Sequence, residues 1–197
     1  MSVIGPSLGT MELLDAHAQA LAVFDNAMHK IGLTDWDSPT PCADWTVRDL
    51  VNHIVGEQLW VPDMLAGRTV EEVGDKFDGD QLHDDPLYAW RESSDAARAA
   101  WVQPGAVERT VHLSYGDESA EQYGWQMTTD LAVHGWDLAT SLGADAGISD
   151  ELAARLLEFI EPQLAMWSGT SMFAEPVPVP DDAPAATRLV ALLGRKP

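Results

Sequence analysis

The stretch TPCADWTVRDLVNHIVGE, residues 40–57, joins a loop that contains proline and cysteine to the start of an amphipathic helix. Thr46 is placed as the N-cap of this helix, and Asp49 follows three residues later as an imperfect capping box. Apolar residues then recur at helical spacing until Gly67, which is a stop signal. The stretch therefore predicts a helix over Val47–Leu65.

Two polar side chains lie at the edge of the apolar face of this helix. His53 and Glu57 are one turn apart, so both flank the core instead of pointing directly into water. Burying an imidazole and a carboxylate is costly unless hydrogen bonds or an ion compensate them. His53 is thus a candidate ligand, and Glu57 is a candidate general base, a hydrogen-bond partner of a ligand, or a solvated carboxylate.

Three further long helices are predicted by the same reasoning. They run over Thr10–Ile31, Pro86–Gln103 and Ser119–Ser141, each with apolar residues at helical spacing and a Gly or Pro signal at its end. The acidic residues 68–85 suit a surface connection, because they carry several glycines and aspartates.

A short β-rich string interrupts this helical pattern. VERTVHLSY, residues 107–115, alternates in polarity and is predicted to be extended, with a turn at Gly116-Asp117. Because the segment is short, it does not change the predicted fold class.

Four long helices of this kind predict an all-α protein, and specifically an up-down four-helix bundle. A fifth helix is expected from Ser149, followed by an extended Pro-rich stretch, EPVPVPDDAP at 175–184, and a short terminal helix in RLVALLGR. We expect one domain over residues 1–197, with the core bundle in 10–141 and the accessory helix and tail in 145–197.

The composition limits the classes of partner. The 197 residues are 46% hydrophobic, as in a packed globular protein, and the formal charge of −21 repels nucleic acid and anionic lipid surfaces. No apolar run is long enough to span a membrane. The acidic charge leaves small molecules or other proteins as the expected partners. The single cysteine and the lack of a signal-peptide pattern favour a cytoplasmic protein, and a homodimer is compatible with the sequence.

A second motif lies in the helix predicted over residues 119–141. TTDLAVHGWDLA, residues 128–139, places Asp130 and His134 one turn apart, with His134 inside the apolar stripe and Asp137 at its margin. His53, Asp130 and His134 together form a set of nitrogen and oxygen donors from two helices. Such a set suits a divalent metal with one coordination position left open. A simple hydrogen-bonded pair of Asp130 and His134 is the structural alternative.

These motifs resemble the DinB-like four-helix bundles, in the branch related to the metal-binding domain of mycothiol-dependent maleylpyruvate isomerase. The resemblance covers nearly the whole chain and rests on four pieces: TPCADWTVRDLVNHIVGE, VHLSYGD, DLAVHGWDLA and APAATRLVALLGRKP. It implies that His53, Asp130 and His134 bind the metal. Asp130 departs from the pattern, since the isomerase has a glutamate there and many DinB-like relatives have a histidine. The larger C-terminal domain of the isomerase has no counterpart in this sequence.

The function expected from this resemblance is that of a metal-dependent enzyme of the thiol-dependent transferase or isomerase type. Zn²⁺ is the expected ion, with Ni²⁺ or another first-row metal as alternatives, and a low-molecular-weight thiol is the expected cofactor. Two other readings stay open at this point. One is a non-catalytic metal- or ligand-binding protein, and the other is a helical interaction module with a hydrogen-bonded His/Asp cluster.

Several other residues were weighed for function. Cys42 precedes a helix N-terminus, where a thiol can be activated, but no histidine stands at a recognisable partnering position, so we expect a loop-packing role. Asp137 is expected to be structural. His112 and Tyr115 are expected near the mouth of a pocket.

The remaining histidines and three tryptophans receive no functional role. His17, His29 and His83 lie in sequence contexts that look exposed. The tryptophans Trp60, Trp125 and Trp136, on or beside the two helices that carry the candidate ligands, are expected in the core.

Overall fold

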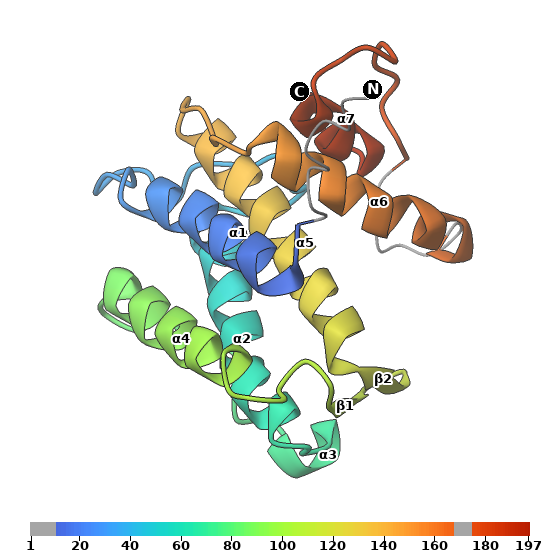
Figure 1. Cartoon of the computed structure of the whole chain (residues 1–197). Coiled ribbons are helices and arrows are strands. Elements are labelled where there is room, and N and C mark those ends of the chain that lie inside the picture. Colours follow the sequence, from blue (N-terminus) through green and yellow to red (C-terminus); the bar gives the residue numbers. More distant parts are fainter. Residues whose placement is uncertain (1–10, 168–174) are drawn as a thin grey trace, which may run out of the picture.

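The computed structural model describes residues 11–167 and 175–197, and the chain in these ranges is mostly helical with one small sheet (Figure 1). The elements are α1 (Leu13–Met28), α2 (Val47–Leu65), α3 (Val70–Val73), α4 (Pro86–Trp101), β1 (Thr110–Leu113), β2 (Gly116–Ser119), α5 (Ala120–Ser141), α6 (Asp150–Trp167) and α7 (Ala185–Leu192). The predicted bounds of α2 are confirmed, and the predicted start of the first helix at Thr10 lies outside the described residues.

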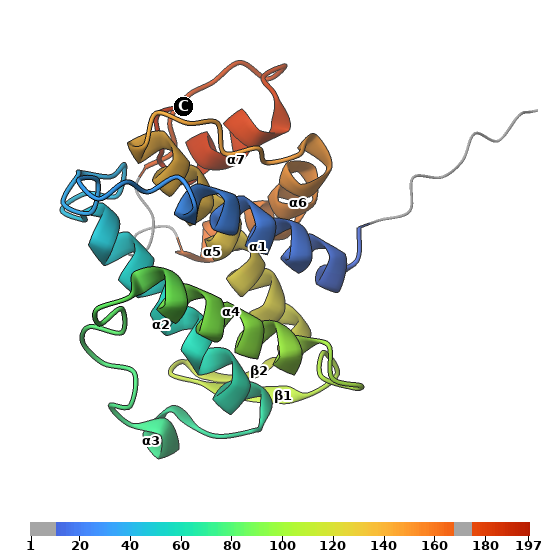
Figure 2. The ribbon, with the colours of Figure 1, turned by 90° about the vertical axis from the view of Figure 1, so that its left-hand side faces the viewer.

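The long helices pack through the apolar stripes that the sequence predicts. α1 lies mainly against α5 and α2 mainly against α4, while α2 also contacts α5 (Figures 1 and 2). Side chains at the centre of these contacts, such as Phe24, Leu50, Ile54 and Leu131, are completely buried. The contact between α2 and α5 joins the two helices that carry the candidate motifs.

The start of α2 shows how local chemistry fixes the orientation of the site. The Thr46 side chain accepts a hydrogen bond from the Asp49 backbone N–H, and the Asp49 carboxylate accepts one from the Thr46 backbone N–H. The capping box is therefore complete, although aspartate replaces the usual glutamate. It sets the point at which the 40–45 loop turns into the helix.

The segment predicted to be extended around residues 107–115 is part of a small sheet, and only the predicted place of its turn was wrong. β1 and β2 form an antiparallel hairpin in which Thr110 pairs with Ser119 and Leu113 pairs with Gly116. The turn is therefore at residues 114–115, and the predicted turn at Gly116-Asp117 instead begins the second strand. Val111 is fully buried, so tertiary packing of the first strand outweighs the low strand propensity of Gly and Asp in the second.

Residues 68–85 also differ from the prediction of a plain connection. They contain the short helix α3, whose first turn is closed by a capping box between Thr69 and Glu72. Thr69 also forms an isolated bridge with His112, so this connection is tied to the hairpin.

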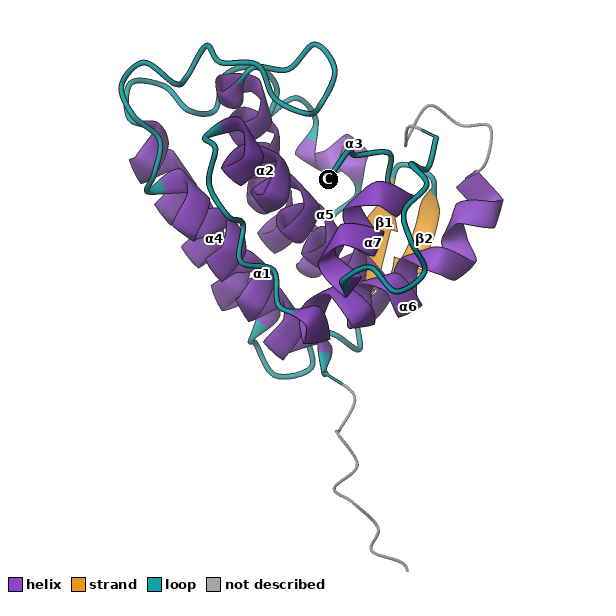
Figure 3. Ribbon diagram, turned by 90° about the horizontal axis from the view of Figure 1, so that it is seen from above, coloured by secondary structure: helices purple, strands orange, loops and turns teal. Residues whose placement is uncertain are grey.

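The C-terminal part of the chain lies on the side of α5 away from α4 (Figures 1 and 3). The Pro-rich residues 175–184 form neither helix nor strand, with a turn at 181–182, and lead to α7, which packs on α6. After α7 the chain reverses at Gly194, whose φ of 85° favours glycine, and the Arg195 N–H donates to the Val190 carbonyl. Within the described residues, no helix is long and apolar enough to cross a membrane.

Candidate metal centre

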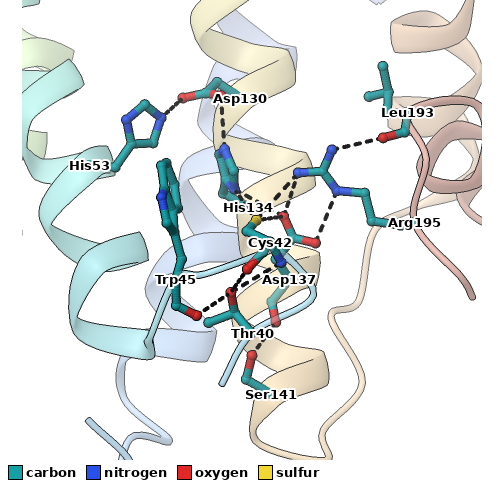
Figure 4. A network of polar contacts seen from close by, with 10 residues as sticks. All are labelled: Thr40, Cys42, Trp45, His53, Asp130, His134, Asp137, Ser141, Leu193 and Arg195. Atoms are coloured by element: carbon teal, nitrogen blue, oxygen red, sulfur yellow. Dashed lines mark hydrogen bonds and ion pairs between the residues drawn. The ribbon is translucent and has the colours of Figure 1, made fainter. Parts of the chain in front are cut away.

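The packing of α2 on α5 brings the two predicted motifs together. His53 Nε2 lies 3.2 Å from Asp130 Oδ2, and His134 Nε2 lies 3.3 Å from Asp130 Oδ1, so the Asp130 carboxylate stands between the two imidazoles (Figure 4). One donor atom from each of the three residues lies within 4.8 Å of the others. His53 comes from α2, whereas Asp130 and His134 lie one turn apart on α5.

The environment of these three residues is largely shielded from water. The His134 side chain is 11% exposed, and those of His53 and Asp130 are about one-third exposed, at 30% and 28%. The group therefore sits between the packed helices with a restricted opening to solvent.

The charges in this group stabilise one another. Burial lowers the pKa of His134, but the Asp130 carboxylate and hydrogen bonds to Asp130 and Asp137 outweigh it and raise the pKa well above its ordinary value. The pKa of His53 is also raised, because the hydrogen bond to Asp130 and its charge outweigh burial. Burial favours a higher pKa for Asp130, but the two imidazoles hold it well below its usual range.

Asp137 supports His134 from the side opposite Asp130. Its side chain is fully buried, and Oδ2 lies 3.0 Å from His134 Nδ1. Because Nδ1 is engaged there, Nε2 is the ring nitrogen that faces Asp130 and His53. The predicted structural role of Asp137 is too narrow, since its carboxylate touches a candidate ligand directly.

Cys42 is also part of this cluster, which corrects the expectation that it has no histidine near it. Its Sγ lies 3.6 Å from His134 Nδ1 and donates to Asp137 Oδ2 at 3.2 Å. Thr40 shapes the loop, because its Oγ1 accepts from the Cys42 N–H and donates to the carbonyls of Cys42 and Trp45. Spacing could not reveal the pair, since Cys42 and His134 are 92 residues apart.

Arg195 was not anticipated as a site residue at all. Its Nη2 donates to Asp137 Oδ2 at 2.7 Å and its Nε donates to Asp137 Oδ1 at 3.2 Å, which is a two-point contact (Figure 4). Nη2 also lies 3.7 Å from Cys42 Sγ. The only sequence signal was its place in the closing APAATRLVALLGRKP segment.

Glu57 lies one turn beyond His53 on α2 and is partly buried. Burial, and then the charge of Asp130, raises the pKa of Glu57 to about 7. A carboxyl group with this pKa can accept and release a proton near neutral pH. The candidate role as a general base is therefore chemically reasonable.

Aromatic rings form one wall of the cluster. The Trp45 ring stacks on His134 at a centroid distance of 5.8 Å, and it lies 5.0 Å from the His53 ring at an angle of 50°. Trp45 comes from the same loop as Cys42, so the 40–45 loop contributes both a thiol and an aromatic surface.

Other residues singled out in the sequence make contacts outside the group of His53, Asp130 and His134, and the place of His112 and Tyr115 at the mouth of a pocket stays a prediction. His112 and Tyr115 are on the hairpin, where His112 Nδ1 is 2.7 Å from Asp117 Oδ1 and the Tyr115 hydroxyl donates to Gln126. His17 was expected to be exposed but is buried against Trp101, so that expectation was wrong. Trp125 is buried, as expected.

The donor atoms of His53, Asp130 and His134 are of the kinds that bind Zn²⁺ with one position left for another ligand. The network around His134 adds the oriented imidazole that metal sites commonly have. Cys42, His134 and Asp137 are a second group of close donors. There, however, the Arg195 guanidinium already supplies a positive charge to Asp137, so the first group is the better cation site.

Comparison with known proteins gives the family. Residues 17–139 match the family described as mycothiol maleylpyruvate isomerase N-terminal domain. Two uncharacterized proteins of Mycobacterium tuberculosis, MT0763 of strain CDC 1551 and Rv0738 of strain H37Rv, are each 28% identical over 94% of this chain and 98% of their own length.

A solved structure has a similar fold. A histidine-to-alanine mutant of mycothiol-dependent maleylpyruvate isomerase matches with a TM-score of 0.57 and 13% identity, over 73% of this chain. The match spans 65% of the isomerase chain, which is less than two thirds of that protein. The resemblance inferred from the sequence motifs is thus confirmed at the level of the family and of a DinB-like fold. This chain belongs to the family of mycothiol maleylpyruvate isomerase N-terminal domains.

Proposed function

We propose that this protein binds one divalent metal ion through His53, Asp130 and His134 and acts as a metal-dependent enzyme of the thiol-dependent transferase or isomerase type. The observation that carries the proposal is the convergence of three donor atoms within 4.8 Å from two helices. Membership of a family named after a mycothiol-dependent isomerase supports the reaction class. Zn²⁺ is the expected ion, with Ni²⁺ or another first-row metal as the alternative.

The chain would supply binding, orientation and proton transfer around that ion. The metal, when bound, would act as a Lewis acid toward a substrate oxygen or a thiol. Trp45 offers a flat apolar surface beside His53 and His134, against which a small organic substrate can pack. Glu57, whose pKa burial raises to about 7 in the metal-free protein, is the residue that would take a proton from the substrate or thiol and return it.

The wider setting belongs to the same proposal. An up-down four-helix bundle formed by α1, α2, α4 and α5 is supported by the contacts of α1 with α5 and of α2 with α4. A low-molecular-weight thiol as cofactor, a small-molecule substrate and a cytoplasmic location suit the reaction class. The net charge of −21 argues against nucleic acid as a partner.

A protein that binds the metal without turnover is the alternative that the same site supports. Its basis is that Cys42, His134, Asp137 and Arg195 already satisfy one another, which a purely structural or ligand-storing site would also show. Three protein donors leave a coordination position open, and this favours the enzyme.

Elemental analysis of the purified protein tests metal binding first. We expect about one equivalent of metal per chain in the parent and almost none in His53→Ala and His134→Ala, because each loses a direct ligand. His112→Ala is the matched control, since His112 is paired on the hairpin, and it should keep its metal. A parent protein that neither contains nor takes up Zn²⁺, Ni²⁺ or Co²⁺ would refute the proposal.

A thiol-transfer and isomerisation screen with the metal-loaded parent then separates the enzyme from the binding protein. Electrophilic small molecules with a low-molecular-weight thiol are the substrates to screen. Turnover that disappears in Glu57→Gln while the metal content stays normal supports the enzyme and the role of Glu57. A metal-loaded protein without turnover supports the alternative.

A further inference from the structure

We propose that Arg195 is a positioning residue for the metal centre: acting through Asp137, it holds His134 so that Nε2 faces Asp130 and His53. This inference rests on the proposed metal site and extends it to the segment that follows α7. It assigns a role to the contact between the segment after α7 and Asp137 on α5.

The contact between Arg195 and Asp137 has the geometry of a strong, directional ion pair. Two guanidinium nitrogens donate to the two carboxylate oxygens, at 2.7 Å and 3.2 Å, and a third nitrogen, Nη1, donates to the Leu193 carbonyl. The Asp137 side chain is 0% exposed and that of Arg195 is 14% exposed. A planar guanidinium bound at these points restrains the carboxylate in rotation as well as in position.

The restrained carboxylate in turn restrains His134. With Nδ1–H donating to Asp137 Oδ2 at 3.0 Å, the lone pair needed for a metal is on Nε2. The ring edge that carries Nε2 faces Asp130 and His53. Arg195 therefore reaches the candidate ligand His134 only through Asp137.

A buried carboxylate also needs the positive charge that Arg195 brings. Asp137 accepts hydrogen bonds from Cys42 and His134, but a metal ligand must be an imidazole without a net charge. In the metal-bound state Arg195 is then the cation that compensates Asp137, and loss of one partner of a buried pair is costly.

The backbone explains how a residue so far along the chain reaches the site. α7 packs on α6, and the reversal at Gly194 directs Arg195 back toward α5. Arg195 and Cys42 are 153 residues apart, yet both touch Asp137 Oδ2. The docking of α7 is thus coupled to the geometry of His134.

Zn²⁺ affinity of the full-length protein, measured by competition with a chromophoric chelator, tests the inference. For Arg195→Met we expect affinity about 10- to 100-fold weaker than in the parent, the range typical of lost partners of metal-binding histidines. Arg195→Lys keeps the charge without the two-point contact and should fall between the two. The visible spectrum of bound Co²⁺ should change in Arg195→Met, because the ligand field reports the orientation of His134.

Arg188→Met is the matched control. Arg188 is on α7 itself, and its replacement removes the same charge as Arg195→Met. Its Nη2, however, lies 3.8 Å from Glu161 in an exposed pair away from the metal centre. It should keep the parent affinity and Co²⁺ spectrum. If Arg195→Met fails to fold, Arg195→Lys carries the test.

Four outcomes overturn the inference or the proposed function on which it rests, and they are distinguishable. A lower melting temperature of metal-free Arg195→Met with unchanged Zn²⁺ affinity and Co²⁺ spectrum would show a structural role only. An equal loss of affinity in Arg188→Met would assign the effect to net charge. If the parent binds no Zn²⁺ or Co²⁺, the proposed function fails. If His53→Ala loses the metal but Arg195→Met behaves like the parent, only the role of Arg195 is refuted.

Discussion

Two buried histidines show how differently two regions of this protein treat the same side chain. His134, between α2 and α5, is 9% exposed, and both of its ring nitrogens face carboxylates. His17, on α1, is 1% exposed, and neither of its ring nitrogens has a hydrogen-bond partner among the described residues. Its ring lies 5.9 Å from that of Trp101, whose indole N–H is likewise unpartnered within those residues.

The difference shows that burial alone does not decide the charge of a histidine. Burial, and then the positive charge of Arg98, lowers the pKa of His17 to about 3. His134 experiences the same kind of burial, yet the carboxylates of Asp130 and Asp137 raise its pKa. A neutral packed ring and a carboxylate-bound ring thus occur within one helical core, and only the second has the chemistry of a ligand site.

Among these predictions, His17→Leu should change the pH dependence of the unfolding free energy most. Between pH 6.5 and 3 the unfolded chain binds a proton on His17 and the folded chain does not, so folded stability falls as pH falls. We expect the parent to lose about 3 kcal/mol relative to His17→Leu between pH 6.5 and pH 4, at about 1.4 kcal/mol per unit. Urea unfolding of the metal-free proteins at several pH values measures this.

Parallel stability curves for His17→Leu and the parent would show that His17 gains a proton while folded. The contrast between the two regions would then disappear. His29→Leu is the matched control, because it removes an exposed histidine just after α1 instead of a buried one.

Glu57→Gln should change the pH dependence of stability less than His17→Leu does, and in the opposite pH direction. The folded pKa of Glu57, about 7, lies above its ordinary value, so its contribution to stability is complete at pH 4 and is lost as pH rises through 7. In chelator-treated protein we expect Glu57→Gln to gain about 1–2 kcal/mol over the parent between pH 4.5 and pH 8, less than a fully buried group would give. Thermal or urea unfolding across this range provides the measurement, and a constant difference would contradict the raised pKa.

The smallest change in stability is expected at the third histidine environment, on the hairpin. His112 faces Asp117 across the strands at 2.7 Å, but the two side chains are 37% and 72% exposed. We expect His112→Ala to cost less than about 1 kcal/mol, because water competes with such exposed pairs. Urea unfolding at neutral pH checks this, and a cost comparable to that of removing a core side chain would mean that the hairpin anchors the fold.

Much of the local structure was predictable from the sequence. The α2 bounds, the N-cap at Thr46 and the one-turn spacing of Asp130 and His134 follow from helical periodicity and from capping chemistry, which act over a few residues. The resemblance to the isomerase family was also visible in motifs of this length. The motifs suggested that His53 meets Asp130 and His134, but this meeting depends on how α2 packs on α5.

The long helices, their apolar faces and the places of the candidate ligands on those faces could be read from local sequence patterns. The side chains around His134 could not, because Cys42, Asp137 and Arg195 meet through loop and helix packing, and Cys42 and Arg195 are 153 residues apart. Tertiary packing likewise buried His17, which the sequence pattern placed in water. Local hydrogen bonding sets secondary structure within a few residues, whereas burial and pairing depend on which distant surfaces pack together.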